Sequence, residues 1–431
     1  MKLVSTAGKA PASTLADAVL RGLAPDGGLY VPDSLTPLAP EAVRALRRHG
    51  FPDVALAVAR HLLSEDLAPD ALERLVVSAF DFPVPVVPLG PRTFVLELFH
   101  GPTLAFKDFG ARFMARLLAA LHVSQDRPLT VLVATSGDTG SAVGHAFLGV
   151  PHTRVVILYP EGKVSPTQER QFSTLGGNVE AIAVQGAFDD CQRLAKAALA
   201  DAELSGSLRL TSANSINVGR LVAQIVYYFF AWADLPDPDR EVIVSVPSGN
   251  FGNLTAGLMA KRMGLPVTAF IAATNANDVV PAYLQSGRFR PRPSAATISS
   301  AMDVGNPSNV ARMQALYDGD LDRLRRDVTG SAHGDDDTRT CIAEVERRFG
   351  YIMDPHSAVG YLGLQGALAE RPNAIGVCLA TAHPAKFREI VEPVIGRAVP
   401  MPERLAAVLT RQPSVRRIPV DLEKLKAVLK G

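Results

Sequence analysis

The sequence predicts an α/β protein in which parallel sheets are covered by helices on both faces. Short, fully apolar runs that are typical of buried strands alternate with segments whose apolar residues recur at helical spacing. Polar loops rich in small residues follow several of these runs, at the strand ends where ligands of such folds bind. The apolar runs are residues 129–135, 154–160, 179–184, 241–247, 267–273 and 375–381.

Composition narrows the class of protein. The 431 residues are 47% hydrophobic and 20% charged, which suits two or three globular domains. A net charge of +1 predicts neither nucleic-acid binding nor attraction to an anionic membrane, and the most apolar run, residues 225–233, is too short to span one. The three cysteines lie far apart and have no metal-ligand spacing, so we expect no metal site and a reducing cytoplasm.

Residues 1–82 are expected to form an N-terminal helical cap. Residues 14–23 and 40–50 place apolar side chains at helical spacing. The turn-rich connector between them contains Asp26-Gly27-Gly28, where we expect unusual backbone angles.

Residues 83–395 are expected to form the main core, with a smaller mobile subdomain over roughly 110–205. The segment of roughly 285–348 is rich in Arg, Asp, Ser and Gly and interrupts the alternation, either as an insertion or as a smaller helical region. Residues 396–431 are expected to form a C-terminal extension with one amphipathic helix.

A glycine-rich loop with the sequence VPSGNFGN occupies residues 246–253, between an apolar run and a helix-like segment. Glycines let the backbone approach a ligand closely, and the N–H groups of the loop and helix start then converge on an anion. A phosphate cradle and an ordinary strand-to-helix turn are equally supported by this loop alone. It is not a P-loop, because no Gly-Lys-Ser/Thr follows it.

A second loop of this kind, ATSGDTG, occupies residues 134–140 and offers the hydroxyl groups of Ser136 and Thr139 to an anion. Asp138 does not fit such a role, because a carboxylate repels an anion unless it turns away to hold a cation or a protonated group. Capping of the next helix is the alternative, and it is the favoured one for this residue taken alone.

The third loop, residues 211–220, clusters Asn214, Ser215 and Asn217, and Arg220 lies about one turn into the following helix. Hydroxyl, amide and guanidinium groups together suit a dianionic phosphate. A helix N-cap followed by an exposed arginine is the alternative. After the last strand-like run, Thr381 is placed for a single hydrogen bond into a cleft, and His383 beside a proline is expected to be structural.

Lys107 stands between aromatic residues in the sequence FHGPTLAFKDFG. A solvent-exposed lysine whose stem packs on apolar neighbours is the commoner arrangement. In an apolar pocket, by contrast, desolvation lowers the pKa of the amine and frees its lone pair to form a Schiff base. A Schiff-base lysine beside a phosphate loop in an α/β fold indicates pyridoxal phosphate, with its aldehyde on Lys107, its phosphate at residues 248–253 and its ring nitrogen facing Thr381.

These motifs together resemble the threonine synthase family, in the longer branch found in many bacteria and fungi. The resemblance runs from about residue 22 to about residue 393, in the family's order. It implies the tryptophan-synthase-β-like fold of pyridoxal-phosphate enzymes (fold type II), with two parallel-sheet α/β domains and the cofactor between them. The motifs are FHGPTLAFKDFG, ATSGDTG, LYPEGKVSPTQERQ, SANSIN, VPSGNFGN, IAATNANDVVP and ATAHPAKF.

The resemblance also implies the reaction and its residues. Members of the family convert O-phospho-L-homoserine and water into L-threonine and phosphate by γ-elimination and β-addition. By resemblance Lys107 carries the cofactor, and Asp138 stands where many relatives have an asparagine that contacts the cofactor's ring oxygen. The cofactor phosphate is assigned to Gly249, Asn250, Phe251, Gly252 and Asn253, the ring nitrogen to Thr381, the substrate carboxylate to Ser136, Gly137, Asp138 and Thr139, and the substrate phosphate to Asn214, Ser215 and Arg220, with Lys163 as the next candidate.

Two alternative functions remain open at this point. A phospho-lyase or dehydratase of the same fold would release an α-keto acid, and a phosphate-ligand binding protein of another class would form no Schiff base. We expect a small-molecule substrate, no nucleic-acid or membrane partner, and a monomer or homodimer in the cytoplasm.

Overall fold

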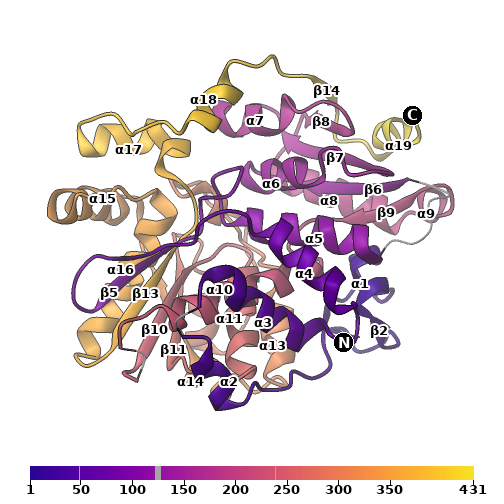
Figure 1. The fold of residues 1–431 in the computed structure, drawn as a ribbon. Coiled ribbons are helices and arrows are strands. Elements are labelled where there is room, and N and C mark those ends of the chain that lie inside the picture. Colours follow the sequence, from indigo (N-terminus) through magenta and orange to yellow (C-terminus); the bar gives the residue numbers. More distant parts are fainter. Residues whose placement is uncertain (48, 122–127, 238) are drawn as a thin grey trace.

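Two sheets form the body of the protein, and helices lie around each of them (Figure 1). The structure, a computed structural model, describes residues 1–47, 49–121, 128–237 and 239–431. Within these residues, every pair of neighbouring strands in the two sheets is parallel except one antiparallel pair at an edge of the larger sheet. The predicted α/β fold with two parallel-sheet domains is confirmed.

The larger sheet has six strands, and its central strands are buried on both faces. In its third strand in spatial order, Val242, Val244 and Val246 pack into one apolar cluster, whereas Ile243 packs into another on the opposite face. The strands in spatial order are β12 (Val328–Ala332), β11 (Ala269–Thr274), β10 (Val242–Pro247), β13 (Ile375–Ala380), β5 (Thr93–Glu97) and β4 (Val86–Pro88).

Helices α10 (Val218–Ala233) and α11 (Gly252–Arg262) cover one face of the larger sheet, and α16 (Pro355–Glu370) covers the other. Helix α10 contains the most apolar run of the sequence, and all of its residues are buried. The remaining helices of this half are α12 (Val279–Ser286), α13 (Val310–Leu316), α14 (Leu321–Asp327), α15 (Asp335–Phe349) and α17 (Arg388–Ile395), with the short 3₁₀ helices η1 (Ser300–Met302) and η2 (Pro384–Phe387).

The smaller sheet has five parallel strands, and its side chains also alternate between two apolar clusters. Its strands in spatial order are β14 (Val415–Ile418), β8 (Val179–Val184), β7 (Thr153–Pro160), β6 (Leu129–Ala134) and β9 (Arg209–Ser212). The helices around it are α5 (Lys107–Leu121), α6 (Asp138–Phe147), α7 (Pro166–Ser173), α8 (Phe188–Ala200), α9 (Ala202–Ser207), α18 (Glu403–Leu409) and α19 (Leu422–Lys430).

The N-terminal region contains the expected helices and, in addition, a small antiparallel sheet that the sequence analysis did not predict. The three strands of this sheet are only four, two and three residues long, too short to give a pattern. Gly27 has a φ of 80°, as expected for the connector. The strands are β1 (Lys2–Ser5), β2 (Ser13–Thr14) and β3 (Tyr30–Pro32), and the helices are α1 (Leu15–Arg21), α2 (Pro40–Ala45), α3 (Phe51–Leu63) and α4 (Pro69–Ala79).

The C-terminal segment holds more structure than the single amphipathic helix expected from its sequence. After α17 the chain passes to the smaller sheet, where β14 pairs with β8 in the register Val415 to Ala181 (Figure 1). Helix α19 then packs Leu425, Val428 and Leu429 into an apolar cluster that also contains the buried residues of α8. The segment 285–348 supplies β12 at the edge of the larger sheet, together with α13, α14 and α15.

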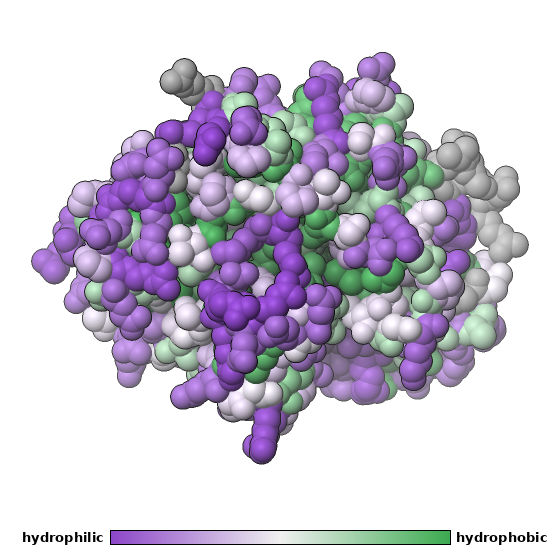
Figure 2. Space-filling view, turned by 90° about the horizontal axis from the view of Figure 1, so that it is seen from below, coloured by the Kyte–Doolittle hydropathy of each residue, from purple (hydrophilic) through white to green (hydrophobic). Residues whose placement is uncertain are grey.

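None of the helices in the described part of the chain is long and apolar enough to cross a membrane. On the face drawn in Figure 2, hydrophilic side chains project outward and hydrophobic ones lie mainly in recessed positions.

Candidate active site

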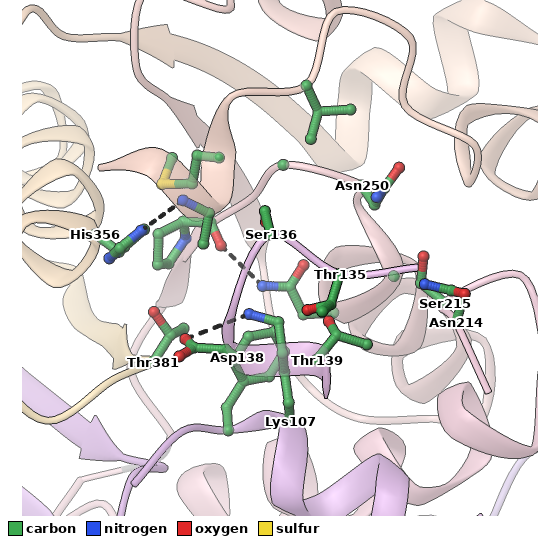
Figure 3. A pocket seen from close by; sticks show the side chains of 18 of the residues that line it. Lys107, Thr135, Ser136, Asp138, Thr139, Asn214, Ser215, Asn250, His356 and Thr381 are labelled. Carbon is green, nitrogen blue, oxygen red and sulfur yellow. Dashed lines mark hydrogen bonds and ion pairs between the residues drawn. The ribbon is translucent and has the colours of Figure 1, made fainter. Parts of the chain in front are cut away.

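A pocket opens at the carboxyl ends of strands from both sheets, between the two halves of the molecule (Figure 3). The segments that follow β6 and β9 line it from the smaller sheet, and the segments that follow β10 and β13 line it from the larger one. This is where parallel α/β sheets place their ligands. Of the predicted site residues, the pocket is lined by Lys107, Ser136, Asp138, Thr139, Asn214, Ser215, Arg220, Gly249, Asn250, Phe251, Gly252, Asn253 and Thr381.

Lys107 begins helix α5 and enters the pocket from a tightly fixed turn. The buried carboxylate of Asp108 accepts hydrogen bonds from the backbone N–H of Thr103 (2.9 Å) and from its hydroxyl (2.7 Å). A Cβ atom on Gly101 would lie 2.4 Å from Oδ2 of Asp108, so only glycine fits there. These contacts fix the backbone from which the Lys107 side chain extends.

The side chain of Lys107 is only 16% exposed, which excludes the solvent-exposed lysine considered from the sequence. Burial lowers the pKa of its amine, and the nearby positive charges of Lys386 and Arg220 lower it further, against the opposing effect of Asp138. The Lys107 amine is therefore disposed to lose its proton and to act as a nucleophile or a base.

Asp138 holds cations and does not cap its helix. Its Oδ1 lies 2.6 Å from the amine of Lys386 and accepts a hydrogen bond from Gln168 (2.8 Å), and its Oδ2 lies 3.6 Å from the amine of Lys107. Burial raises the pKa of the Asp138 carboxyl, but Lys386 and Lys107 outweigh burial and hold the pKa well below its usual range. Asp138 is therefore ionised, and the N-cap position of α6 is Gly137.

Lys386 is the residue that the sequence analysis missed. It is fully buried, and its amine donates to the carbonyl of Thr103 (2.8 Å) as well as pairing with Asp138. A signal was available, because Lys386 stands in the sequence HPAKF among apolar residues, in the same manner as Lys107. Gln168 on α7 gave no comparable signal, because a polar residue on a helix is ordinary.

The 246–253 loop offers backbone donors to the pocket. Among the described residues, the N–H groups of Asn250, Phe251, Gly252 and Asn253 have no hydrogen-bond acceptor. Phe251 adopts a left-handed backbone conformation with a φ of 59°, a strained state that is typical of functional loops. The side chain of Asn253 donates to the carbonyl of Pro247 (2.8 Å) and thereby braces the loop. These free donors at the start of α11 favour the anion cradle over an ordinary turn.

Arg220 is 4% exposed, so the exposed arginine considered from the sequence is excluded. Its Nη1 donates to the carbonyl of Ala213 (2.8 Å), and burial lowers its pKa to about 10, which leaves it charged at neutral pH. Asn214 also lines the pocket, but its amide accepts from the N–H of Ala134 (3.1 Å) and donates to the carbonyl of that residue (2.6 Å). Asn214 therefore joins the ends of β9 and β6.

Gly137 does not line the pocket, unlike Ser136 and Thr139 beside it. Its N–H donates to the hydroxyl of Thr135 (2.9 Å), and a Cβ atom on it would lie 2.6 Å from the side chain of Gln168. Its φ of 143° also requires glycine. Gly137 shapes the loop rather than offering a donor to a ligand.

Two histidines lie near the site, and both are held by structural contacts. Nδ1 of His383 accepts from the N–H of Ala385 (3.1 Å) at the start of η2, and burial lowers its pKa to about 4. His356 lines the pocket, with Nδ1 2.5 Å from Asp354 and Nε2 accepting from the N–H of Ala301 (3.1 Å). In the part of the chain that the structure describes, no group of His, Cys, Asp and Glu is arranged to hold a metal ion.

Comparisons with known families cover nearly the whole chain. Residues 2–80 match the family described as threonine synthase N terminus, and residues 357–429 match threonine synthase, C-terminal. Residues 83–379 match the family described as pyridoxal-phosphate dependent enzyme.

Curated proteins and solved structures agree with these matches. The chain is 45% identical over 417 residues to the threonine synthase of Escherichia coli, with 96% of each chain covered. The crystal structure of the Escherichia coli threonine synthase superposes with a TM-score of 0.94 and 44% identity, covering 100% of this chain and 99% of that one. A structure of threonine synthase from Brucella melitensis with pyridoxal phosphate bound superposes with a TM-score of 0.92 and 38% identity, with the same coverage of both chains.

Proposed function

The chain belongs to the threonine synthase family and converts O-phospho-L-homoserine and water into L-threonine and phosphate, and from this premise we propose how the residues of its pocket divide that reaction. This function replaces the two alternatives considered from the sequence, which were a lyase that releases an α-keto acid and a phosphate-binding protein. The observation that carries the assignment of roles is the desolvated amine of Lys107, which faces the 246–253 loop across one pocket.

Pyridoxal phosphate, the cofactor of the family, fits the donors that line this pocket. Lys107 would bind its aldehyde covalently, because its amine has a lowered pKa. The free N–H groups at the start of α11 would hold its phosphate, and the Thr381 hydroxyl would face its ring nitrogen. When bound, the cofactor withdraws electrons from the substrate and stabilises negative charge at its carbons.

The remaining groups act on the substrate. Lys107 would also serve as the base that takes the proton from Cα and, after passing that proton on, the proton from Cβ, because each transfer needs an uncharged amine. Ser136 and Thr139, at the start of α6, would bind the substrate carboxylate. Arg220 lines the pocket together with Asn214 and Ser215. Its positive charge would stabilise the phosphate that leaves Cγ. A proton is then delivered to Cγ, water adds at Cβ and gives up a proton, Cα regains a proton, and the departed phosphate takes up the remaining one.

The reaction is tested by product balance. Purified protein with O-phospho-L-homoserine should release threonine and phosphate in equal amounts, with pyridoxal phosphate bound. Release of phosphate together with an α-keto acid would contradict the proposal. A control without the cofactor should release neither product.

We also propose that the enzyme works in the cytoplasm as a monomer or homodimer. All three cysteines are free and buried, which suits a reducing compartment. Light scattering coupled to size-exclusion chromatography would give the mass to compare with 45.8 kDa for one chain, and cell fractionation would give the compartment. A mass above that of a dimer, or recovery outside the cytoplasmic fraction, would contradict these assignments.

A further inference from the structure

Two lysines share one buried carboxylate at the base of the pocket. Asp138 lies 2.6 Å from the amine of Lys386 on one oxygen and 3.6 Å from the amine of Lys107 on the other (Figure 3 shows the contact with Lys107). One negative charge can compensate only one of two buried ammonium groups. The other would remain an uncompensated buried charge, which is costly in free energy. One of the two amines is therefore driven toward its uncharged form.

The surroundings of the two lysines decide which amine keeps its proton. Lys386 is 0% exposed, and its amine has two acceptors, Asp138 and the carbonyl of Thr103 at 2.8 Å. The amine of Lys107 has no hydrogen-bond acceptor among the described residues, since its distance of 3.6 Å from Asp138 exceeds a hydrogen bond. Hydrogen-bond acceptors of the protein thus stabilise an ammonium group at Lys386 but not at Lys107.

We propose that Lys386 is a positioning residue. By pairing with the carboxylate of Asp138, it leaves the amine of Lys107 uncharged. Without Lys386, the carboxylate of Asp138 would pair with Lys107 alone and hold a proton on it. A protonated Lys107 could neither bond to an aldehyde nor accept a proton from the substrate. This inference rests on the assignment of Lys107 to the cofactor made above.

The other charged groups around the pair act in the same direction or are already engaged. Arg220 on α10 adds a positive charge near Lys107. The carboxyl of Asp108 on α5 is held by Thr103. His356 and Asp303 line the same pocket, and Asp303 is bonded to Asn275 and Thr297. No second carboxylate lies within ion-pair distance of Lys107 among the described residues, so the effect depends on Asp138 and Lys386.

The proposal explains why an aspartate can stand in a loop that also receives anions. Lys386 neutralises the carboxylate of Asp138, and Gln168 fixes its orientation. The Asp138–Lys386 pair as a whole is uncharged, as an asparagine at position 138 would be.

The test is the reactivity of Lys107 itself. Lys386→Met and Lys386→Gln both remove the charge, and glutamine keeps a hydrogen-bond donor in case the apolar variant fails to fold. The full-length chain, freed of cofactor, is acetylated with a trace of acetic anhydride over a pH series, and mass spectrometry follows the peptide that contains Lys107. Lys163, which is exposed, serves as the internal reference. We expect labelling of Lys107 relative to Lys163 to fall about tenfold at neutral pH in either variant, the effect of one neighbouring charge.

The double variant Lys386→Met with Asp138→Asn is the matched control. It removes both charges of the pair, so labelling of Lys107 should return close to that of the wild type. Unchanged labelling in folded single variants would overturn the proposal, as would an equal loss in the double variant, which would mark a packing defect. Failure of the Lys107 assignment is a separate result, because it would appear as the cofactor bound to another lysine in the unaltered protein.

Discussion

The amine of Lys107 lies 3.6 Å from the carboxylate of Asp138, within ion-pair distance but beyond a hydrogen bond. The same carboxylate is bonded more closely by Lys386, at 2.6 Å. Lys107 is thus held near a negative charge without being bonded to it, which is the placement that a reactive amine requires.

Gly252→Ala should weaken cofactor binding while leaving the fold intact. A Cβ atom on Gly252 would meet only ordinary contacts, 3.5 Å from Asn309 and 3.6 Å from Ser215, so the protein itself accommodates it. We expect faster loss of pyridoxal phosphate on dialysis, because the methyl group would take up space at the N–H groups that we assign to its phosphate. Thermal unfolding without cofactor should match the wild type.

Gly249→Ala is the informative contrast to Gly252→Ala. A Cβ atom on Gly249 would lie 2.8 Å from the backbone carbonyl of Ala301, so this variant should lower the stability of the cofactor-free protein as well. If Gly252→Ala retains the cofactor as well as the wild type does, the 246–253 loop is a turn and the phosphate is held elsewhere.

Arg220→Ala should reduce turnover of O-phospho-L-homoserine by on the order of two to three decades in kcat, because a charge that stabilises the leaving phosphate is lost. The visible absorption of the bound cofactor should persist. A slow side reaction with an unphosphorylated amino acid, such as serine deamination, should fall much less.

Equal loss of both activities in Arg220→Ala would make Arg220 structural and place the substrate phosphate elsewhere. Lys163 was the next candidate from the sequence. In the structure Lys163 is exposed and does not line the pocket, so it does not replace Arg220 there.

Asp26→Asn should destabilise the N-terminal turn in a pH-dependent way. Its carboxylate accepts hydrogen bonds from the hydroxyl of Ser5 (2.7 Å) and from backbone N–H groups including that of Ala10 (2.8 Å). The hydrogen bond from Ser5, with those from the backbone, lowers the pKa of Asp26 from 3.8 to about 2. A lowered folded-state pKa stabilises the protein above pH 3.8, and this contribution is lost as the pH falls toward about 2.

Denaturant unfolding of the wild type and Asp26→Asn across this pH range is the measurement. The difference between the two proteins should be largest above pH 4 and should shrink as the pH falls, because protonated aspartic acid then resembles the amide. A difference that is constant with pH would show that the carboxylate charge contributes nothing.

Leu425→Ala should destabilise the protein by about 2–5 kcal/mol, because Leu425 is fully buried where α19 packs against the smaller sheet. Lys424→Ala, at the exposed neighbouring position, should change the free energy of unfolding by less than about 0.5 kcal/mol. Equilibrium unfolding in urea compares the two. Equal, small effects would mean that the C-terminal segment is not part of the folded core.

The strands and most of the site could be predicted from the sequence, because both have local signals. Strands buried on both faces are continuous apolar runs, such as residues 129–134 and 375–380. The loops after them contain small and polar residues, and thirteen of the fourteen residues assigned to the site line one pocket. Gly137 is the exception, since its role depends on contacts with Thr135 and Gln168 that no local pattern shows.

The features that were missed depend on contacts between distant parts of the chain. Lys386 and Asp138 are 248 positions apart in the sequence, so no local sequence pattern indicates that they pair. Strand β14 contains exposed arginines and is only four residues long, and it becomes a strand because β8 offers it an unpaired edge. The three short strands of the N-terminal sheet also lack a pattern of their own.

The identity of the lysine that carries the cofactor tests the account most directly. The purified enzyme is reduced with borohydride, which fixes the cofactor on its lysine, and is then digested and analysed by mass spectrometry. The account predicts the label on the peptide that contains Lys107, and predicts that Lys107→Ala abolishes both the label and turnover. A label on any other lysine, including Lys386, would contradict it.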